Sequence, residues 1–532
     1  MSKGWYLKQN VLVEPLYNQW YAWSHLISPV TAAMNVVNFQ FKIMHSFVTA
    51  PLVHVSAMRN PQMRGGPFIH YDETRVNDVK ALMERIRKNQ AHLFKLCEDI
   101  LTLEEILTKE ANGLSLETIY QKVPNTLRGY VELIYDAKNR PSIRFIEGLL
   151  YKSSYYDEGS QGVVLSLINS DNRPFVLSSP RLLGDGDVYV SRGFRTNGYD
   201  ELFKMKGMPQ PLDWLKEMLD LKDYSDRELE FLFTDQAPEV KPDYKDSDIR
   251  IRYFGHACVL IESGNISILC DPLVSYQYEK STGRHTYVDL PRKLDYVLIT
   301  HSHQDHFVLE TLLQLRHKIG KIILPKNNPG SLLDPSLKLI LRNIGFRDVV
   351  EVNELESVEI EGGLIISVPF LGEHGDLDVR SKTAYLVQIR GRSVLLAADS
   401  NNLEPELYGH IQKLFGDIDL LFLGMECKGA PFTWLYGPLI SKPLPRKMDQ
   451  SRRLNGSDCL RAVELVRRVR PKAVYIYAMG QEPWMSHLTS TYYTEESLPI
   501  IESNKLVDQC KLRGTFAERL FITKECYLRG RL

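Results

Sequence analysis

Apolar residues in the second half of the chain form short runs separated by amphipathic or polar stretches. These runs stand at 249–262, 266–270, 294–300, 321–325, 363–369, 383–389, 393–399, 419–423 and 473–479. A short apolar run bounded by turn residues is typical of a buried strand. Apolar residues recur at helical spacing in the stretch 307–318 and in the stretch that follows Asp458. Buried strands mixed with helices predict layered sheets covered by helices.

The first half of the chain has a different pattern. Apolar residues recur at helical spacing within 73–110, which predicts one or two helices. Residues 128–152 predict a hairpin with a polar turn at its centre, and strands are expected at 162–168 and 187–191. This half therefore predicts an α+β domain.

A linker separates the two halves. Residues 236–248 contain two prolines, many charges and almost no large apolar side chain, which is the composition of a connecting segment. We therefore expect an N-terminal domain over 1–245 and a second domain over 246–532.

Composition narrows the possible functions of the 532 residues. Lys and Arg number 65 against 66 Asp and Glu, so the net charge of −1 argues against a protein that holds nucleic acid by bulk charge. No run of consecutive apolar residues reaches the length of about 18 that is needed to span a membrane, and the N-terminus has no apolar signal segment. The seven cysteines lack a CxxC pair, which favours a reducing compartment. We expect a cytoplasmic protein without nucleic-acid or membrane partners.

The segment 300–306, Thr-His-Ser-His-Gln-Asp-His, carries the strongest chemical signal. His301, His303, Asp305 and His306 follow an apolar strand directly. One loop can thus present ligands to two neighbouring metal ions, the arrangement used in two-metal chemistry. A polar loop that caps the following helix would explain Asp305 but not three histidines. The segment therefore predicts metal binding.

This HxHxDH pattern resembles the signature of the metallo-β-lactamase superfamily, over about residues 249–490. The segment 254–261 resembles the first strand pair of that family, and Asp271 its structural aspartate. The resemblance implies an αββα sandwich with metals at one sheet edge. It also implies a bridging ligand at Asp399 and a late histidine ligand, for which His487 is the candidate and His410 a weaker one.

The family's remaining ligand should come from residues 369–376, where both Glu373 and His374 are available. With His374 the site would be rich in histidine and would suit two zinc ions and the hydrolysis of an ester, thioester or phosphodiester. With Glu373 one metal would have His301, His303, Glu373 and Asp399 as ligands. The other would have Asp305, His306, Asp399 and His487. That oxygen-rich set resembles the environment of non-haem iron in oxygen chemistry.

A closer resemblance favours Glu373. The aromatic start at residues 5–23 and the segments around 372–374 and 477–484 are similar to the diiron β-hydroxylases of chloramphenicol and nonribosomal peptide biosynthesis, nearly end to end. The resemblance implies two iron ions, with Glu373 in place of a histidine ligand. The implied reaction is oxygen-dependent β-hydroxylation of an aminoacyl group held as a thioester on a carrier domain.

The same resemblance implies that dioxygen is the co-substrate and that a separate protein donates electrons. It also implies a homodimer whose N-terminal domain supplies dimer contacts and covers the active site. Glu426 follows another strand end and could orient a ligand. The basic segment 441–472 could dock an acidic carrier, but a solvated helix face explains it more simply.

Overall fold

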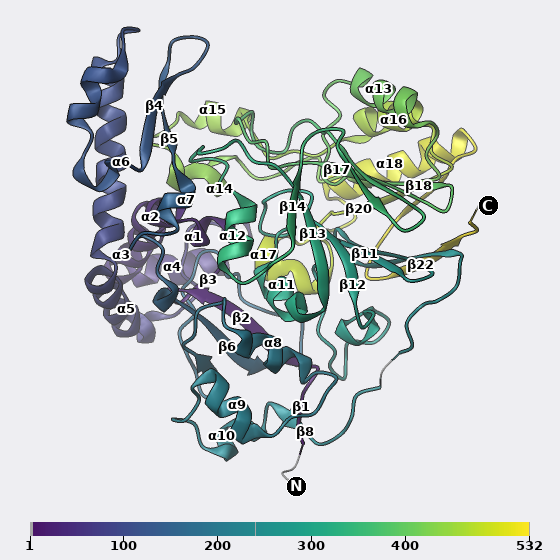
Figure 1. Ribbon diagram of the computed structural model, residues 1–532, viewed down its shortest axis with the longest axis horizontal. Helices are drawn as coiled ribbons and strands as arrows, with labels where there is room; N and C mark the ends of the chain where they lie inside the picture. Colours follow the sequence, from purple (N-terminus) through teal and green to yellow (C-terminus); the bar gives the residue numbers. More distant parts are fainter. Residues whose placement is uncertain (1–3, 240, 531–532) are drawn as a thin grey trace.

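The computed structural model describes residues 4–239 and 241–530, and Figure 1 shows their arrangement. The N-terminal half contains an antiparallel sheet in the order β3-β2-β6-β7 and two two-stranded sheets, β1-β8 and β4-β5. The predictions at 162–168 and 187–191 are confirmed as β6 and β7. Strand β2 was not predicted, and all seven of its residues are buried. The strands are β1 (Tyr6–Leu7), β2 (Val11–Tyr17), β3 (Trp20–Tyr21), β4 (Val131–Tyr135), β5 (Pro141–Phe145), β6 (Gln161–Leu167), β7 (Val188–Val190) and β8 (Phe233–Thr234).

Helices pack beside these sheets. The predicted helical stretch 73–110 consists of a short 3-10 turn and two helices that separate at Gln90, whose side-chain amide donates to Asp157. The predicted hairpin is confirmed, but its second strand ends at Phe145 and a short helix follows. The α-helices are α1 (Ser24–Ile27), α2 (Pro29–Asn35), α3 (Phe41–Thr49), α4 (Pro51–Arg59), α5 (Val76–Asn89), α6 (Ala91–Glu110), α7 (Glu147–Leu150), α8 (Asn197–Lys204), α9 (Leu212–Leu219) and α10 (Asp226–Glu230).

The second half is a sandwich of two seven-stranded sheets, as its pattern predicts. The first sheet has the order β14-β13-β12-β11-β10-β9-β22, and the second has the order β15-β16-β17-β18-β19-β20-β21. The strands of the first sheet are β9 (Ile249–Gly255), β10 (Cys258–Ser263), β11 (Ile266–Cys270), β12 (Leu294–Leu298), β13 (Ile319–Pro325), β14 (Val349–Val352) and β22 (Lys524–Leu528). Those of the second are β15 (Ser357–Ile360), β16 (Gly363–Val368), β17 (Ala384–Ile389), β18 (Arg392–Leu396), β19 (Leu420–Gly424), β20 (Ala473–Tyr477) and β21 (Phe516–Arg519).

Apolar side chains fill the space between the two sheets, because both inner faces are lined by branched and aromatic residues. The buried Tyr385 crosses this space, and its hydroxyl donates to the carbonyl oxygens of Ile299 and Ile323 at 3.0 and 3.1 Å. The helices of this half are α11 (Leu309–Leu315), α12 (Leu337–Asn343), α13 (Glu406–Phe415), α14 (Thr433–Tyr436), α15 (Arg446–Ser451), α16 (Cys459–Val469), α17 (Ser486–Thr489) and α18 (Leu498–Leu512).

Helices α13, α16 and α18 cover the outer face of the second sheet. Asp458 caps α16 by accepting from the backbone of Arg461, as the sequence indicates. Leu460, near the start of this helix, is 80% exposed. The buried face comprises Cys459, Ala462, Leu465, Val466 and Val469.

The two halves share one continuous apolar core, which also includes the outer face of the first sheet. Polar contacts join the halves as well. The guanidinium of Arg316, just after α11, donates to the carbonyl oxygens of Phe194 and Thr196. In the described part of the segment 236–248 there is neither helix nor strand, and it runs along the outside of the molecule (Figure 1). The linker therefore connects two halves that are packed tightly together.

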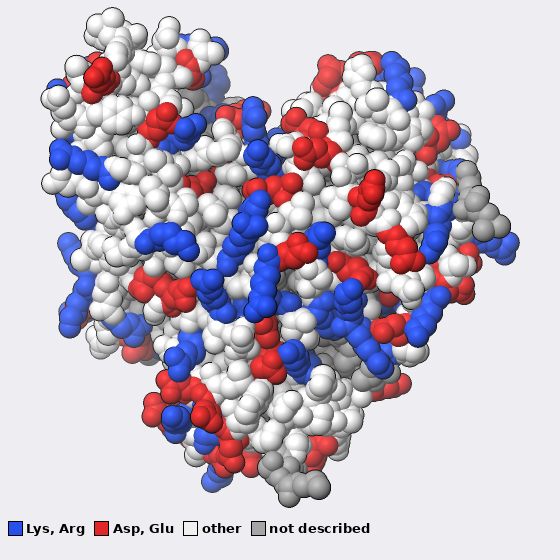
Figure 2. Space-filling model, in the orientation of Figure 1, with Lys and Arg blue, Asp and Glu red and all other residues white. Residues whose placement is uncertain are grey.

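The surface carries both signs of charge. In Figure 2, basic and acidic side chains lie next to one another over much of the visible face. Arg467, Arg468 and Arg470 pair with Glu464, Glu406 and Asp417, respectively. These pairs support the interpretation of the basic segment 441–472 as a solvated helix face. Within the described ranges, none of the helices has the length and apolar character needed to cross a bilayer.

Candidate metal centre

Loops from both sheets meet at one edge of the sandwich. Strands β9, β11 and β12 of the first sheet run in the same direction, and so do β16, β18 and β19 of the second. Their carboxyl ends therefore place the following loops at a common edge. The polar residues of these loops are His256, Asp271, His301, His303, Asp305, His306, Glu373, Asp399 and Glu426.

The first group of metal-binding side chains consists of His301, His303 and Glu373. Nε2 of His301 lies 3.1 Å from Nδ1 of His303, and that Nδ1 lies 3.3 Å from Oε1 of Glu373. All three side chains are buried, and their ligand atoms lie within 4.8 Å of one another. Glu373 has a φ of 70°, in the left-handed region that L-residues seldom adopt. Such strain is concentrated at functional sites, where the surrounding structure holds it in place.

Asp399 joins this group to a second one. Its Oδ2 lies 3.0 Å from Nε2 of His306 and 3.8 Å from Nε2 of His301. His301, His306 and Asp399 form a buried set of possible ligands. A carboxylate between two sets of imidazoles is suited to bridging two metal ions.

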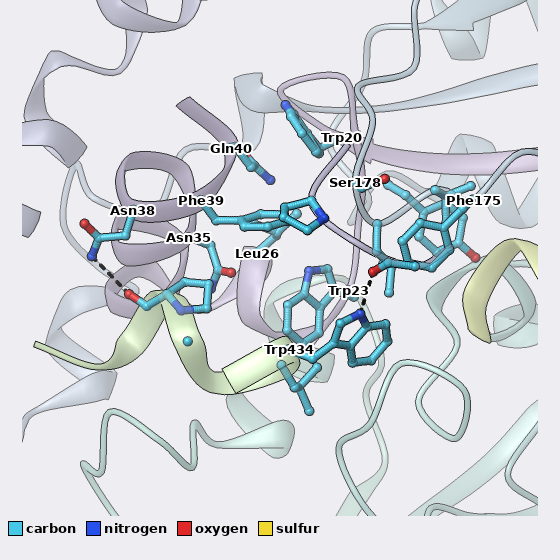
Figure 3. A pocket seen from close by; sticks show the side chains of 18 of the residues that line it. Trp20, Trp23, Leu26, Asn35, Asn38, Phe39, Gln40, Phe175, Ser178 and Trp434 are labelled. Atoms are coloured by element: carbon cyan, nitrogen blue, oxygen red, sulfur yellow. Dashed lines mark hydrogen bonds between the residues drawn. The ribbon is translucent and has the colours of Figure 1, made fainter. Parts of the chain in front are cut away.

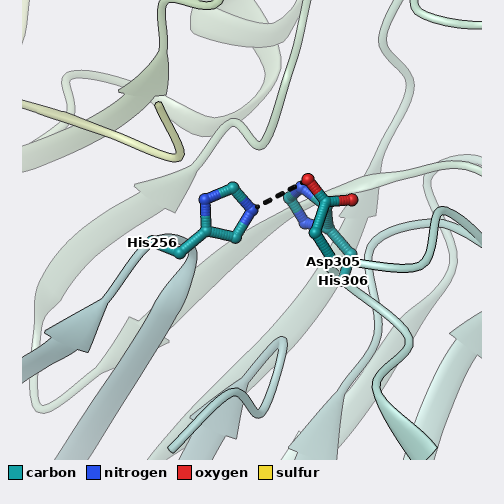
Figure 4. A group of neighbouring side chains, drawn as sticks. All are labelled: His256, Asp305 and His306. Carbon is teal, nitrogen blue, oxygen red and sulfur yellow. Dashed lines mark ion pairs between the residues drawn. The ribbon is translucent and has the colours of Figure 1, made fainter. Parts of the chain in front are cut away.

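His256 belongs to the third group, with Asp305 and His306, and sequence reasoning missed it. Its Nε2 lies 3.3 Å from Oδ2 of Asp305, as Figure 4 shows. His256 lies in the turn between β9 and β10 with a φ of 50°. The available signal was a polar residue in a tight turn between two apolar strands, in the very segment that resembles the family's first strand pair.

The structure does not bring His487 into these groups, which corrects the expectation that it is a ligand. Its Nδ1 lies 2.8 Å from the carbonyl oxygen of Trp484, and its Nε2 lies 2.9 Å from a guanidinium nitrogen of Arg173. Both ring nitrogens therefore contact other protein groups. The weaker candidate, His410, lies in α13 on the outer side of the second sheet.

His374, the alternative to Glu373, lies behind the first group. Its Nδ1 is 2.7 Å from the hydroxyl of Tyr436, and its ring centroid is 4.5 Å from that of His303. Of these two neighbours, only Glu373 appears in a possible ligand group among the described residues.

A carboxylate behind the cluster orients His306. Asp271 has a φ of 40° and lies 2.8 Å through Oδ2 from Nδ1 of His306. The backbone amide and the hydroxyl of Thr300 both donate to Asp271. This arrangement directs Nε2 of His306 towards Asp399, as carboxylate–histidine pairs do at metal sites.

The cluster concentrates negative charge in a buried place. Burial, together with the charges of Asp399 and Glu426, raises the pKa of Glu373 well above its usual range. Burial and the nearby Asp305 and Asp399 raise the pKa of Glu426 in the same way. Burial alone would lower the pKa of His306, but the surrounding aspartates raise it well above its usual range. The cluster therefore favours a cation.

The donor atoms also fit metal ions. Nε2 of His256 and Nε2 of His306, the atoms that face Asp305 and Asp399, are buried and have no hydrogen-bond partner within the described ranges. Unpaired buried polar atoms are rare in proteins, and a bound metal ion would satisfy these two. The mixture of imidazole and carboxylate ligands is one that iron and zinc both accept.

Comparison with known proteins identifies the family. Residues 6–238 match the family described as the diiron non-heme beta-hydroxylase N-terminal domain, and residues 250–429 match a beta-lactamase superfamily domain. A curated relative from Streptomyces venezuelae is 39% identical over 97% of this chain and 98% of its own length. That relative is named 4-amino-L-phenylalanyl-[CmlP-peptidyl-carrier-protein] 3-hydroxylase.

The solved structures agree with this assignment. The crystal structure of CmlA, a diiron beta-hydroxylase from Streptomyces venezuelae, superposes with a TM-score of 0.92 at 39% identity. The match covers 99% of this chain and all of that chain. A metal-dependent hydrolase from Methanosphaera stadtmanae is 25% identical over 36% of this chain and 82% of its own length. This chain belongs to the family of diiron non-haem β-hydroxylases.

Proposed function

We propose that this protein is an oxygen-dependent diiron monooxygenase. It hydroxylates the β-carbon of an aminoacyl group that is tethered as a thioester to the carrier domain of a nonribosomal peptide synthetase. The relative that is 39% identical over nearly the whole chain is named for such a reaction on a carrier-bound amino acid. The observation that carries the proposal is the position of Glu373, within 3.3 Å of a histidine in the metal-binding cluster.

Each metal ion has a proposed set of ligands. One iron would be held by His301, His303, Glu373 and Asp399, and the geometry of the first group supports this set. The other would be held by Asp305, His306 and Asp399, with His256 in the place first expected for His487. Asp399 would contribute to both sets, because its Oδ2 is close to histidines of both.

When bound, the two irons supply the oxidising chemistry: dioxygen, two electrons and two protons convert a C–H bond into C–OH and release one water. The electrons come from an external donor protein. Glu373 brings a negative charge to the first set, where a histidine would bring none, and such oxygen donors suit iron in oxygen chemistry. Dense burial around His301 and His306 keeps bulk water from the reacting centre.

Metal analysis and a product assay test this proposal. The purified protein should contain two irons per chain and little zinc. The reduced protein, incubated with aminoacyl-loaded carrier domain and oxygen, should add the mass of one oxygen atom to the tethered amino acid. Two tightly held zinc ions and hydrolysis of the thioester would instead establish the dizinc hydrolase.

A further inference from the structure

The turn that carries Glu373 has a backbone conformation that L-residues seldom adopt. Gly372, Glu373 and Gly375 have φ values of 86°, 70° and 58°. A side chain at Gly372 would collide with Asn401, since an added Cβ would lie 2.5 Å from the Cβ of Asn401. Nζ of Lys382 donates to the carbonyl oxygen of Gly372 at 3.0 Å, directly before Glu373. Lys382 therefore holds this turn by one of its backbone oxygens.

The segment 431–438 packs against the same turn. An added Cβ at Gly375 would lie 2.5 Å from the Cβ of Phe432, so the two residues are in close contact. Other residues of the segment, including Trp434, line a pocket of about 440 Å³ that Figure 3 shows. Among the described residues that line this pocket there is no member of the three metal-binding groups. The segment therefore stands between the pocket and Glu373, which is buried.

Lys382 is also joined to the histidine loop. Its backbone forms an isolated antiparallel bridge with His301, and the N–H of Thr383 donates to the carbonyl oxygen of Thr300 at 2.7 Å. Nζ of Lys382 lies 5.6 Å from the centroid of the Phe370 ring, which stands edge to face with the ring of His301 at 6.1 Å. Lys382 thus contacts both segments that supply the first group of metal-binding side chains.

The ammonium of Lys382 is a partly buried cation that lacks a direct ion pair among the described residues. Burial lowers the pKa of Lys382, and the charges of Glu373, Asp334 and Asp376 oppose that shift. A buried charge without a paired counter-charge is unfavourable, and a neutral side chain could also donate to a carbonyl oxygen. Holding the turn therefore explains the hydrogen bond but not the charge.

The charge of the metal-binding cluster gives the ammonium a role. A carboxylate at position 373, in place of a neutral imidazole, adds a negative charge to a site that already contains Asp305, Asp399 and Glu426. Negative charge stabilises ferric relative to ferrous iron and lowers the reduction potential of an iron site. A cation beside the turn of Glu373 opposes this effect, and charges in buried surroundings are screened little by salt.

We propose that Lys382 is a positioning residue that raises the reduction potential of the iron pair, an inference that rests on the proposed function. Its ammonium offsets the negative charge that Glu373 brings to the first set of ligands. Its hydrogen bond to the carbonyl oxygen of Gly372 holds the turn, and with it the carboxylate that lies 3.3 Å from His303. Reduction by the external electron donor is thereby made more favourable.

A redox titration of the iron-loaded protein, followed by electron paramagnetic resonance and without substrate, tests this inference. Lys382→Met removes the charge and the donor, Lys382→Gln removes the charge and keeps a donor, and Lys382→Arg keeps both. At a fixed potential the ratio of ferrous to ferric iron should fall about tenfold in the Met and Gln variants, the effect of one charge near a partly buried site. Lys382→Arg should restore the ratio of the unchanged protein. The matched control Lys216→Met, at a partly buried position in α9, should show no shift.

Three results would overturn the inference. The first is an unchanged potential in both Lys382→Met and Lys382→Gln. The second is a higher potential in these variants, since release of the Glu373 carboxylate from the iron would act in that direction. The third is an equal fall in Lys382→Met and Lys382→Arg, which would assign the effect to packing. Circular dichroism checks folding, and Lys382→Gln provides the test if Lys382→Met does not fold.

The outcome separates this inference from the proposed function. A lower potential in Lys382→Met and Lys382→Gln, in a protein that hydroxylates nothing, would uphold the role of Lys382 and reject the reaction. Hydroxylation by the unchanged protein, with equal potentials in all the Lys382 variants, would uphold the reaction and reject the role of Lys382. If the purified protein contains zinc, the metal-free protein can be loaded with iron, and the potentials are then compared in the same way.

Discussion

Nε2 of His256 lies 3.3 Å from Oδ2 of Asp305, so the turn between β9 and β10 meets the loop that follows β12. These two residues are 49 positions apart in the chain, and the sandwich brings them together because β9 and β12 end at the same edge. In the proposed ligand sets, His256 takes the place that was expected for His487. Substitutions of these two histidines are therefore expected to have opposite effects on the metal content.

His256→Gln should lower the iron content from two to about one per chain, because the second set of ligands loses an imidazole. His487→Gln is the matched control, and it should keep both irons since its ring nitrogens face Trp484 and Arg173. Iron analysis of the two purified variants checks this. Retention of two irons by the first variant and loss of one by the second would restore His487 as the ligand.

Glu373→His should abolish hydroxylation while the fold is retained. The substitution replaces a negative oxygen ligand by a neutral imidazole, and we expect turnover to fall by about 100-fold or more. The measurement is product formation together with the metal content after growth with iron and with zinc. Glu354→His, in an exposed loop, is the control and should leave turnover unchanged. Unaltered hydroxylation by the Glu373 variant would remove that residue from the metal site.

Asp271→Asn should weaken metal binding by about 10–100-fold, which is typical for loss of a carboxylate that orients a histidine ligand. The amide keeps the shape of the side chain but removes the charge facing Nδ1 of His306. Titration of the apo protein with ferrous iron checks the expectation. Asp223→Asn, at an exposed position, should titrate as the unchanged protein does. Equal affinity in both variants would argue against an orienting role for Asp271.

Lys206→Met should make the protein more stable near neutral pH. Burial lowers the pKa of Lys206 to about 7, and Nζ lies over the rings of Tyr276 and Tyr287. In the unfolded chain the amine has a pKa of about 10.4, so between these values the unfolded state binds more protons and stability rises with pH. Below pH 7 the folded protein carries the full free-energy cost of keeping the buried amine charged. Methionine removes that cost.

The variant should therefore gain about 2–4 kcal/mol of unfolding free energy at pH 6–7, and its advantage should shrink as the pH approaches 10. Urea unfolding at several pH values measures this. Lys222→Met, which changes an exposed lysine, should show no such pH-dependent gain. A constant difference between Lys206→Met and the unchanged protein at all pH values would show that burial does not lower the pKa of Lys206.

The local pattern of apolar residues was sufficient to predict most strands of the sandwich. The strands around Ile268, Val297 and Leu395 are apolar on both faces, because a sheet covers one side and helices or the N-terminal half cover the other. Strand β2 escaped prediction because Glu14 and Pro15 interrupt its apolar run. The carboxylate of Glu14 is buried against Arg173 and Arg181, partners that only the tertiary structure supplies.

Some residues of the metal-binding cluster could be predicted from the sequence, and others could not. His301, His303, Asp305 and His306 lie in one loop, so their proximity follows from the sequence alone. His256 could not be found like this, because a lone histidine in a turn has no neighbouring ligand in the sequence. His487 follows the late strand expected to carry a ligand, but α17 turns its ring towards Arg173. The direction of a side chain after a strand depends on packing that periodicity does not encode.

Because the two halves share one core, neither half is expected to separate from the other and stay folded. Glu310, in the catalytic half, is buried against Arg173 and accepts from the hydroxyl of Tyr21, both from the other half. Separation would leave that carboxylate without its partners and would expose a large apolar surface to solvent. A protease cut within the connecting segment should therefore yield two fragments that co-migrate as a complex, and neither fragment should be recovered alone in a folded form.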